Sequence, residues 1–104
     1  MKFINIPFNA WSKDKLNKVI KCATSRTKQY GEKGNYFMVD GRTYQIEFIV
    51  ELPLWFVKHF LYETEGCETP DEFEVVWCKI HPVKGFDSSQ IVYYHFFNDV
   101  TAFI

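Results

Sequence analysis

Several sequence features that mark particular protein classes are absent from this 104-residue chain. No apolar run approaches the ~20 residues that a membrane-spanning helix requires, and the apolar start of the chain, residues 3–7, is too short for a secretory signal. Internal repeats, low-complexity tracts and linkers are also missing. The length and the lack of a linker predict one domain over residues 1–104, without a membrane as partner.

Cysteine is scarce, and the three thiols, Cys22, Cys67 and Cys78, form neither an even set nor a C-x-x-C pair. An odd number without that spacing argues against a disulfide framework and indicates free thiols in a reducing cytoplasm. The three histidines show no ligand spacing relative to these cysteines, so we expect no zinc site. We also expect no cofactor.

Net charge is nearly absent, but charge is unevenly distributed. The chain carries −1 overall, whereas residues 13–33 carry +5 and residues 40–74 carry −7. A basic segment beside an acidic one fits the binding of a small anionic or nucleotide-like ligand on one side. Two solvated helix faces of opposite sign would give the same distribution. A protein that coats duplex DNA is basic overall, so duplex DNA is not an expected partner.

Aromatic residues, in contrast, make up 19% of the chain and hydrophobic residues 47%, which indicates a folded core. The clearest local signal is Asp40-Gly41, which separates the strand-like runs 34–39 and 42–51. Asp-Gly favours a type I′ hairpin because both turn residues need a positive φ. In the second run, apolar residues alternate with polar ones: Tyr44, Ile46, Phe48 and Val50. This period of two predicts a strand with one buried face.

The remaining predicted elements alternate between helices and strands. In chain order they are an edge strand over 2–8, a helix over 10–21 capped by Asn9 or Ser12, a loop over 21–33, a helix from Pro53 to near Gly66, a helix from Thr69-Pro70 to Pro82, a strand over 90–98 and an optional strand over 100–104. This order predicts an α+β domain. About five strands with many aromatic residues favour a small, partly open barrel.

The segment from Lys21 to Arg26 places a potential base, a hydroxyl and a fixed cation within six residues. The Thr24 hydroxyl becomes a nucleophile only if a neighbour takes its proton. Lys21 can do this if burial or nearby positive charge lowers its pKa, and Arg26 can steady an oxyanion. Residue types alone favour ordinary structural roles: a lysine at a helix end, a turn hydroxyl and a surface ion pair.

The pattern Lys21-x-x-Thr24-x-Arg26, followed by Gly31 and Gly34 before a strand, resembles the G-x-K-x-x-T-x-R signature of the ASCH domain family, a branch of the PUA-like superfamily. Three later stretches also resemble its small bacterial members: residues 69–73, 80–82 and 92–96. The resemblance implies a small PUA-like β-barrel of about five to six strands with two to three helices. Two positions depart from the family pattern: Val19 replaces a frequent Gly, and Asn35 a frequent Asp.

Members of this length include bacterial amidohydrolases that remove the acetyl group from N4-acetylcytidine. Their catalytic set implies that Lys21 activates Thr24, that Thr24 attacks the acetyl carbonyl, and that Glu72 assists proton transfer. The resemblance also places Arg26 in the substrate pocket. Tyr30 is a candidate for stacking on a base because of its ring and location.

The role of Glu72 has an alternative that depends only on local sequence. With Thr69 it can form a capping box at the start of the helix that follows. Glu74 is then the fallback carboxylate. The function likewise has alternatives: a PUA-like module that binds RNA without catalysis, or a ribonuclease in the same cleft that uses a transient Mg²⁺ or Mn²⁺. The expected partners are a modified nucleoside or RNA, and the protein is expected to be a monomer.

Overall fold

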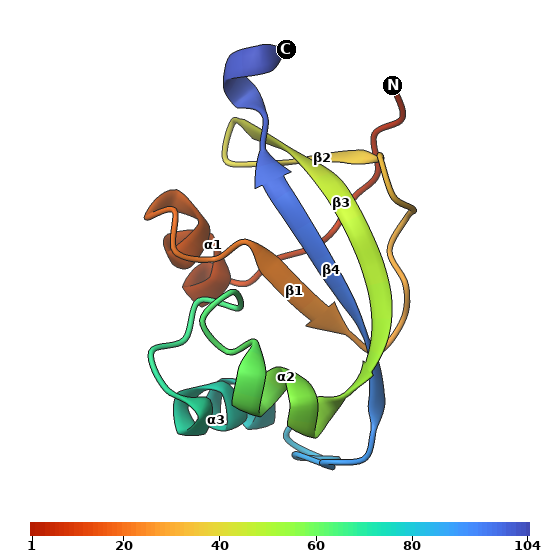
Figure 1. The fold of residues 1–104 in the computed structure, drawn as a ribbon. Helices are drawn as coiled ribbons and strands as arrows, with labels where there is room; N and C mark the ends of the chain where they lie inside the picture. Colours follow the sequence, from red (N-terminus) through yellow and green to blue (C-terminus); the bar gives the residue numbers. More distant parts are fainter.

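A computed structural model of residues 1–104 shows one four-stranded sheet, three α-helices and a C-terminal 3-10 turn (Figure 1). In chain order these are α1 (Ala10–Asn17), β1 (Ala23–Arg26), β2 (Tyr36–Val39), β3 (Arg42–Pro53), α2 (Leu54–Phe60), α3 (Pro70–Ile80), β4 (Ile91–Asp99) and η1 (Thr101–Phe103). The strand order is β1-β4-β3-β2, and all neighbours are antiparallel. The predicted α+β class is confirmed.

The sheet curls into a half-barrel and does not close (Figure 1). The strongly bent β3 runs along one side of it, and α2 and α3 lie together at one end. The helix α1 lies beside β1, and both chain termini lie at the end opposite α2 and α3. The four strands are fewer than the five to six that we expected.

The hairpin between β2 and β3 confirms the strongest local prediction. Asp40 has a φ of 49° and Gly41 a φ of 81°, so both turn residues adopt the positive φ of a type I′ turn. The register then runs from the Val39–Arg42 pair to the Tyr36–Gln45 pair. Asp tolerates this conformation better than most residues because its short side chain bonds locally.

Only the first half of β3 follows the predicted alternation. Tyr44 and Ile46 are buried, but Phe48 and Val50 are 44% and 40% exposed. The cause is a bulge between Ile46 and Phe48 in the pairing with β4. One extra residue moves every later side chain to the opposite face of a sheet. A period of two in the sequence contains no signal for such an insertion.

Two predicted strands are wrong. Residues 2–8 form only a single bridge, between Phe3 and Tyr36, because Pro7 and the turn into α1 leave too few residues to pair. Residues 101–103 form the 3-10 turn η1 in place of a last strand. The predicted loop over 21–33 is wrong in its first part, because residues 23–26 form β1.

The first helix is shorter than predicted. Asn9 is its N-cap, with Oδ1 accepting a hydrogen bond from the Ser12 amide at 2.8 Å. The helix ends at Asn17. Val19 then adopts a φ of 60° and lies exposed, as does Ile20, so neither side chain contributes to the core. This early end releases Lys21 from the helix and lets the chain turn back into β1.

Two apolar clusters form the core. The first lies between the sheet and α2 and α3 and contains Ala23, Leu54, Val57, Cys67, Phe73, Trp77, Val92 and Tyr94. The second packs against the N-terminal segment and contains Ile6, Leu16, Phe37, Val39, Tyr44, Ile46 and Phe97. In the second, Phe37 and Phe97 meet edge to face with ring centroids 5.1 Å apart, a geometry that contributes about 0.5–1.5 kcal/mol beyond area burial.

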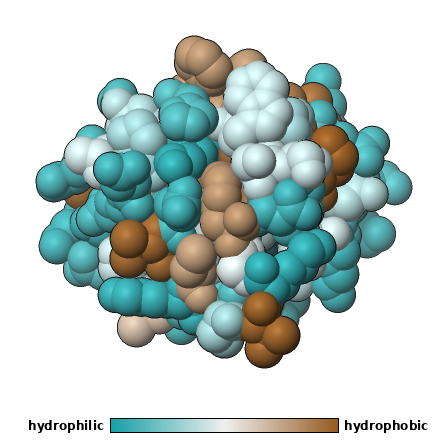
Figure 2. Space-filling model, turned by 90° about the horizontal axis from the view of Figure 1, so that it is seen from below, coloured by the Kyte–Doolittle hydropathy of each residue, from teal (hydrophilic) through white to brown (hydrophobic).

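The end of the molecule that carries α2 and α3 has a mixed surface. Figure 2 looks onto it and shows apolar residues interspersed with hydrophilic ones. The exposed apolar side chains of these helices include Trp55, Phe60, Val75 and Ile80. None of the helices is long and apolar enough to cross a membrane.

Candidate functional site

A cavity of about 250 Å³ opens beside β1. Its walls come from the N-terminal segment and α1, from Lys21, β1 and the loop that follows, and from residues 65–67 with α3. Its apolar lining includes three aromatic rings, those of Trp11, Phe73 and Trp77, together with the aliphatic side chains of Val76 and Ile80. The polar part includes Lys21, Thr24, Ser25, Arg26, Tyr30 and Glu65. Four of the five site residues predicted from the sequence therefore line one cavity.

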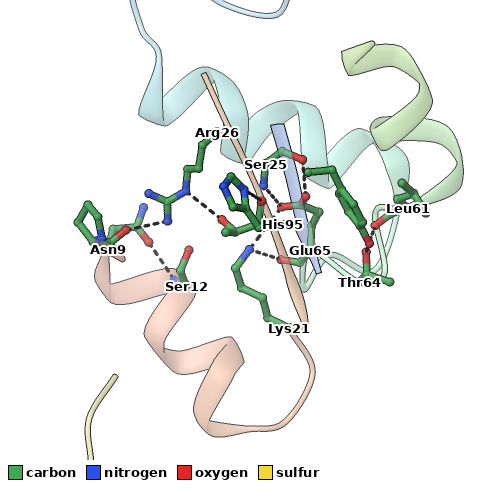
Figure 3. A network of polar contacts seen from close by, with 12 residues as sticks. Asn9, Ser12, Lys21, Ser25, Arg26, Leu61, Thr64, Glu65 and His95 are labelled. Atoms are coloured by element: carbon green, nitrogen blue, oxygen red, sulfur yellow. Dashed lines mark hydrogen bonds and ion pairs between the residues drawn. The ribbon is translucent and has the colours of Figure 1, made fainter. Parts of the chain in front are cut away.

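Lys21 and Glu65 form a buried ion pair at the base of this site. The two residues are 6% and 5% exposed. The Lys21 ammonium donates to the Glu65 backbone oxygen at 3.0 Å and to its Oε1 at 3.4 Å (Figure 3). Burial lowers the pKa of Lys21, and the nearby Arg26 charge acts in the same direction, while Glu65 opposes both. Lys21 is thus a buried, paired lysine with a lowered pKa, not an exposed residue at a helix end.

The Glu65 carboxylate is held from β1. Ser25 Oγ donates to Oε2 at 2.7 Å, and the Ser25 amide donates to Oε1 at 3.3 Å. The backbone of Thr64, the residue before Glu65, is bound to the same region: the amides of Cys22 and Ala23 donate to the Thr64 oxygen at 2.8 and 2.9 Å. Residues 64–65 therefore occupy the edge of β1 that faces away from β4.

Thr24 lies on the opposite face of β1 from Ser25, because side chains alternate along a strand. It is buried, and its Oγ1 accepts a hydrogen bond from Arg26 Nε at 3.0 Å. Arg26 reaches across to the Pro7 oxygen, to which Nη2 donates at 2.7 Å, near Asn9 at the start of α1 (Figure 3). Thr24 Oγ1 therefore keeps its own proton available for donation, beside a fixed positive charge.

Lys21 and Thr24 line the same cavity without a direct hydrogen bond between their side chains. Lys21 precedes β1, and Thr24 lies within it. The two side chains are therefore not brought together by a shared helix face. A substrate group or a water molecule in the cavity would have to connect them.

His95 fixes this part of the cavity wall from β4. Its ring is fully buried; Nε2 accepts from the Tyr30 amide at 2.9 Å, and Nδ1 lies 3.1 Å from the Thr24 oxygen. Because Nε2 accepts, the proton resides on Nδ1, which donates to Thr24. Burial lowers the pKa of His95, so the neutral ring is the form that holds Thr24 and Tyr30 in place. No sequence pattern pointed to this residue.

Acid should weaken the fold through His95. The unfolded chain takes up this proton near pH 6.5, whereas the folded state takes it up at a lower pH. The contribution to stability is therefore complete above about pH 6.5 and is lost as pH falls, by at most about 1.4 kcal/mol per pH unit. Urea unfolding at pH 7.5, 6.5 and 5.5 measures this slope. His95→Gln should flatten it, and an unchanged slope would contradict the assignment.

The structure does not bring Glu72 to the other site residues. It lies at the start of α3, where its amide donates to Thr69 Oγ1 at 3.1 Å and its Oε1 accepts from the Glu68 amide at 2.7 Å. The first contact is the N-cap bond of the predicted capping box, whereas the carboxylate binds the amide one residue before the cap, so Glu72 serves the helix start. Glu72 does not line the cavity. Glu74 also lies outside it and binds Lys58 at 2.6 Å. The carboxylate in the cavity is Glu65, which sequence reasoning missed.

The three cysteines are free, and no group of three or more His, Cys, Asp or Glu side chains is arranged to hold a metal ion. Cys67 lines the cavity, but burial raises its pKa to about 12. A thiol with this pKa is protonated at neutral pH and is a poor nucleophile. Cys67 is therefore a poor candidate for the nucleophile of this cavity.

Comparison with known proteins supports the fold. No protein-family model matches the chain, and no curated protein sequence matches it. Among solved structures, the chain is similar to the ASCH domain from Lactobacillus crispatus JV V101, with a TM-score of 0.65 and 12% sequence identity. The similarity covers 95% of this chain and 79% of that one. The fold is therefore ASCH-like, as the motif around Lys21 implied, and at this identity the similarity establishes the fold alone.

Proposed function

We propose that this protein is an amidohydrolase that removes an acyl group from a modified pyrimidine nucleoside such as N4-acetylcytidine. The observation that carries the proposal is the buried Lys21–Glu65 pair, which shares a cavity with the hydroxyl of Thr24. A buried lysine with a lowered pKa beside a hydroxyl and an arginine is a combination suited to acyl transfer. An ASCH-like fold is compatible with hydrolase activity.

In the proposed reaction, Lys21 first passes its ammonium proton to Glu65, and the Thr24 oxygen then attacks the acyl carbonyl while the neutral Lys21 amine takes the hydroxyl proton. Arg26 stabilises the negative charge that develops on the carbonyl oxygen. Lys21 then returns the proton to the departing N4 amine, which leaves an ester on Thr24. A water molecule that Lys21 deprotonates hydrolyses this ester and releases the carboxylic acid. Glu65 takes the part first given to Glu72, because it is the carboxylate that holds Lys21.

The size of the cavity favours a small substrate. Its volume of about 250 Å³ is below the ~300–1,000 Å³ of pockets that enclose drug-sized ligands. One base with its acyl group is the part of a substrate that this volume suits. The ring of Tyr30 and the aromatic wall offer flat apolar surface to such a base.

The charges around Tyr30 favour RNA binding as the second candidate function. The Arg26 and Lys28 side chains lie 5.5 and 4.9 Å from the centroid of its ring. An aromatic ring flanked by cations is a common platform for a base and its phosphate. On this alternative, the cavity would accept one base of a single strand without chemistry.

The direct test is incubation of the pure protein with N4-acetylcytidine, with cytidine release followed by chromatography. Turnover supports the proposal. The role of the carboxylate is decided by two matched variants: Glu65→Gln should lower turnover by roughly 10²-fold or more, whereas Glu72→Gln should keep it near the wild-type rate. The opposite ranking would return the role to Glu72.

Absence of turnover, together with binding of short single-stranded RNA that weakens as salt rises, would replace the proposal with the RNA-binding module. RNA cleavage that requires added Mg²⁺ or Mn²⁺ would replace it with the ribonuclease.

A further inference from the structure

Next to Thr24 in β1, the cavity is also lined by Ser25, whose hydroxyl lies outside the Lys-x-x-Thr-x-Arg pattern. We propose that Ser25 is a positioning residue of this site: it fixes the Glu65 carboxylate and, through it, the Lys21 ammonium. This inference rests on the proposed function. It assigns Ser25 no covalent step.

The hydrogen bonds of Glu65 show why its position depends on Ser25. Lys21 contacts only Oε1 of the carboxylate, at 3.4 Å. The other oxygen, Oε2, has Ser25 Oγ as its single partner, at 2.7 Å. Glu65 is too buried for water to replace that bond freely. A glutamate side chain has three rotatable bonds, so loss of the contact lets the carboxylate turn away from Lys21 or leaves Oε2 unsatisfied.

The Ser25 hydroxyl makes no hydrogen bond other than the one to Glu65. Ser25 lies on the same face of β1 as Ala23, which packs in the first core cluster. An alanine would suit a buried position of this kind, because a buried hydroxyl is unfavourable unless it is hydrogen-bonded. The one hydrogen-bond partner of Ser25 Oγ is the Glu65 carboxylate.

A hydroxyl bonded to a carboxylate is also an arrangement that nucleophiles show. The position of Arg26 separates the two roles. Its Nε binds Thr24 Oγ1 at 3.0 Å, so the cation that would stabilise an oxyanion lies on the Thr24 face of β1. Ser25 is on the other face with Glu65, to which Lys21 also bonds, so Arg26 is the group that distinguishes the two hydroxyls. The geometry points to attack by Thr24 and positioning by Ser25.

The test compares Ser25→Ala, Ser25→Thr and Thr43→Val in turnover of N4-acetylcytidine. Thr43 is a matched control, because it is a buried strand hydroxyl on β3 that does not line the cavity. Ser25→Ala should lower kcat by about 10- to 100-fold, with KM changed by less than about threefold, since one hydrogen bond to a charged group is lost and no substrate contact is removed. Ser25→Thr keeps the hydroxyl and should recover most of kcat, and Thr43→Val should match the wild type.

Three results would overturn the inference. They are an unchanged kcat in Ser25→Ala, an equal loss in Thr43→Val, and complete loss in Ser25→Ala together with an acyl group that fragment-ion mass spectrometry of the quenched wild-type reaction locates on Ser25 and not on Thr24. Failure of the proposed function looks different, because the wild type itself would then release no cytidine. In that event urea unfolding of Ser25→Ala, Glu65→Gln and the double variant still tests the contact. Additive losses of stability would overturn the positioning role, and a coupling between the two sites would support it.

Discussion

Replacement of Glu65 by leucine should lower the free energy of unfolding by about 3–5 kcal/mol, the usual consequence of removing one member of a buried ion pair. The Lys21 ammonium would keep only the backbone oxygen of residue 65 as a partner. The Ser25 hydroxyl and amide would both lose their acceptor. Urea unfolding at neutral pH, with circular dichroism as the signal, measures the loss.

The double variant Lys21→Met/Glu65→Leu is the control for this prediction. Replacing both members of a buried pair by apolar residues is often neutral or stabilising, although Ser25 would remain unpaired. We therefore expect the double variant to recover at least half of the stability that Glu65→Leu loses, and yet to release no cytidine. If its loss of stability instead equalled the sum of the two single losses, the pair would have no energetic coupling.

Replacement of Thr24 by alanine should reduce turnover of N4-acetylcytidine by roughly 10³-fold or more, the scale seen when an enzyme loses its nucleophile. The fold should survive, because the side chain makes one hydrogen bond, to Arg26, worth about 1–3 kcal/mol. Cytidine release under single-turnover conditions measures the rate, and thermal unfolding confirms the fold.

Thr24→Ser is the complementary test of Thr24 as the nucleophile. Serine keeps the hydroxyl on the Arg26 side of the strand, so this variant should retain far more activity than Thr24→Ala. An acyl group should also be found on residue 24 when the reaction is quenched early. Turnover by Thr24→Ala at the wild-type rate would remove Thr24 as nucleophile and leave Ser25 or a water molecule in that role.

Elements whose cause is local were predictable from the sequence. The Asp40-Gly41 turn needs only two residues with positive φ, and the Thr69-Pro70 start of α3 needs only a cap and a residue with fixed φ. Neither element depends on contacts with distant parts of the chain.

The strand β1 was missed because its cause is not local. Its four residues, Ala23–Arg26, lack an alternating pattern and include three polar side chains. They form a strand because β4 pairs with them on one side and residues 64–65 bind them on the other. Those partners are about 40 to 70 positions away in the chain, a distance over which a short sequence pattern contains no information.

The residues of the candidate site also fall into two groups, those that a local motif predicts and those that only the folded chain brings together. Lys21, Thr24 and Arg26 are close in sequence and came from one motif, and the structure brings all three to the cavity. Glu65 could not be chosen among the nine acids of residues 40–74, because only the folded chain places it beside Lys21. The capping pattern drew attention to Glu72 for a reason that concerns the helix start and not the cavity.

The edge of β1 has a consequence for how copies of this protein behave toward one another. An edge strand with unpaired backbone groups is a template for pairing with a second chain. Here the outward amides of Ala23 and Ser25 are already occupied, by the Thr64 oxygen and the Glu65 carboxylate. Glu65 therefore also shields the sheet from self-association. Loss of this carboxylate would leave the Ser25 amide unpaired at the sheet edge, so we expect Glu65→Leu to associate with itself more readily than the wild type.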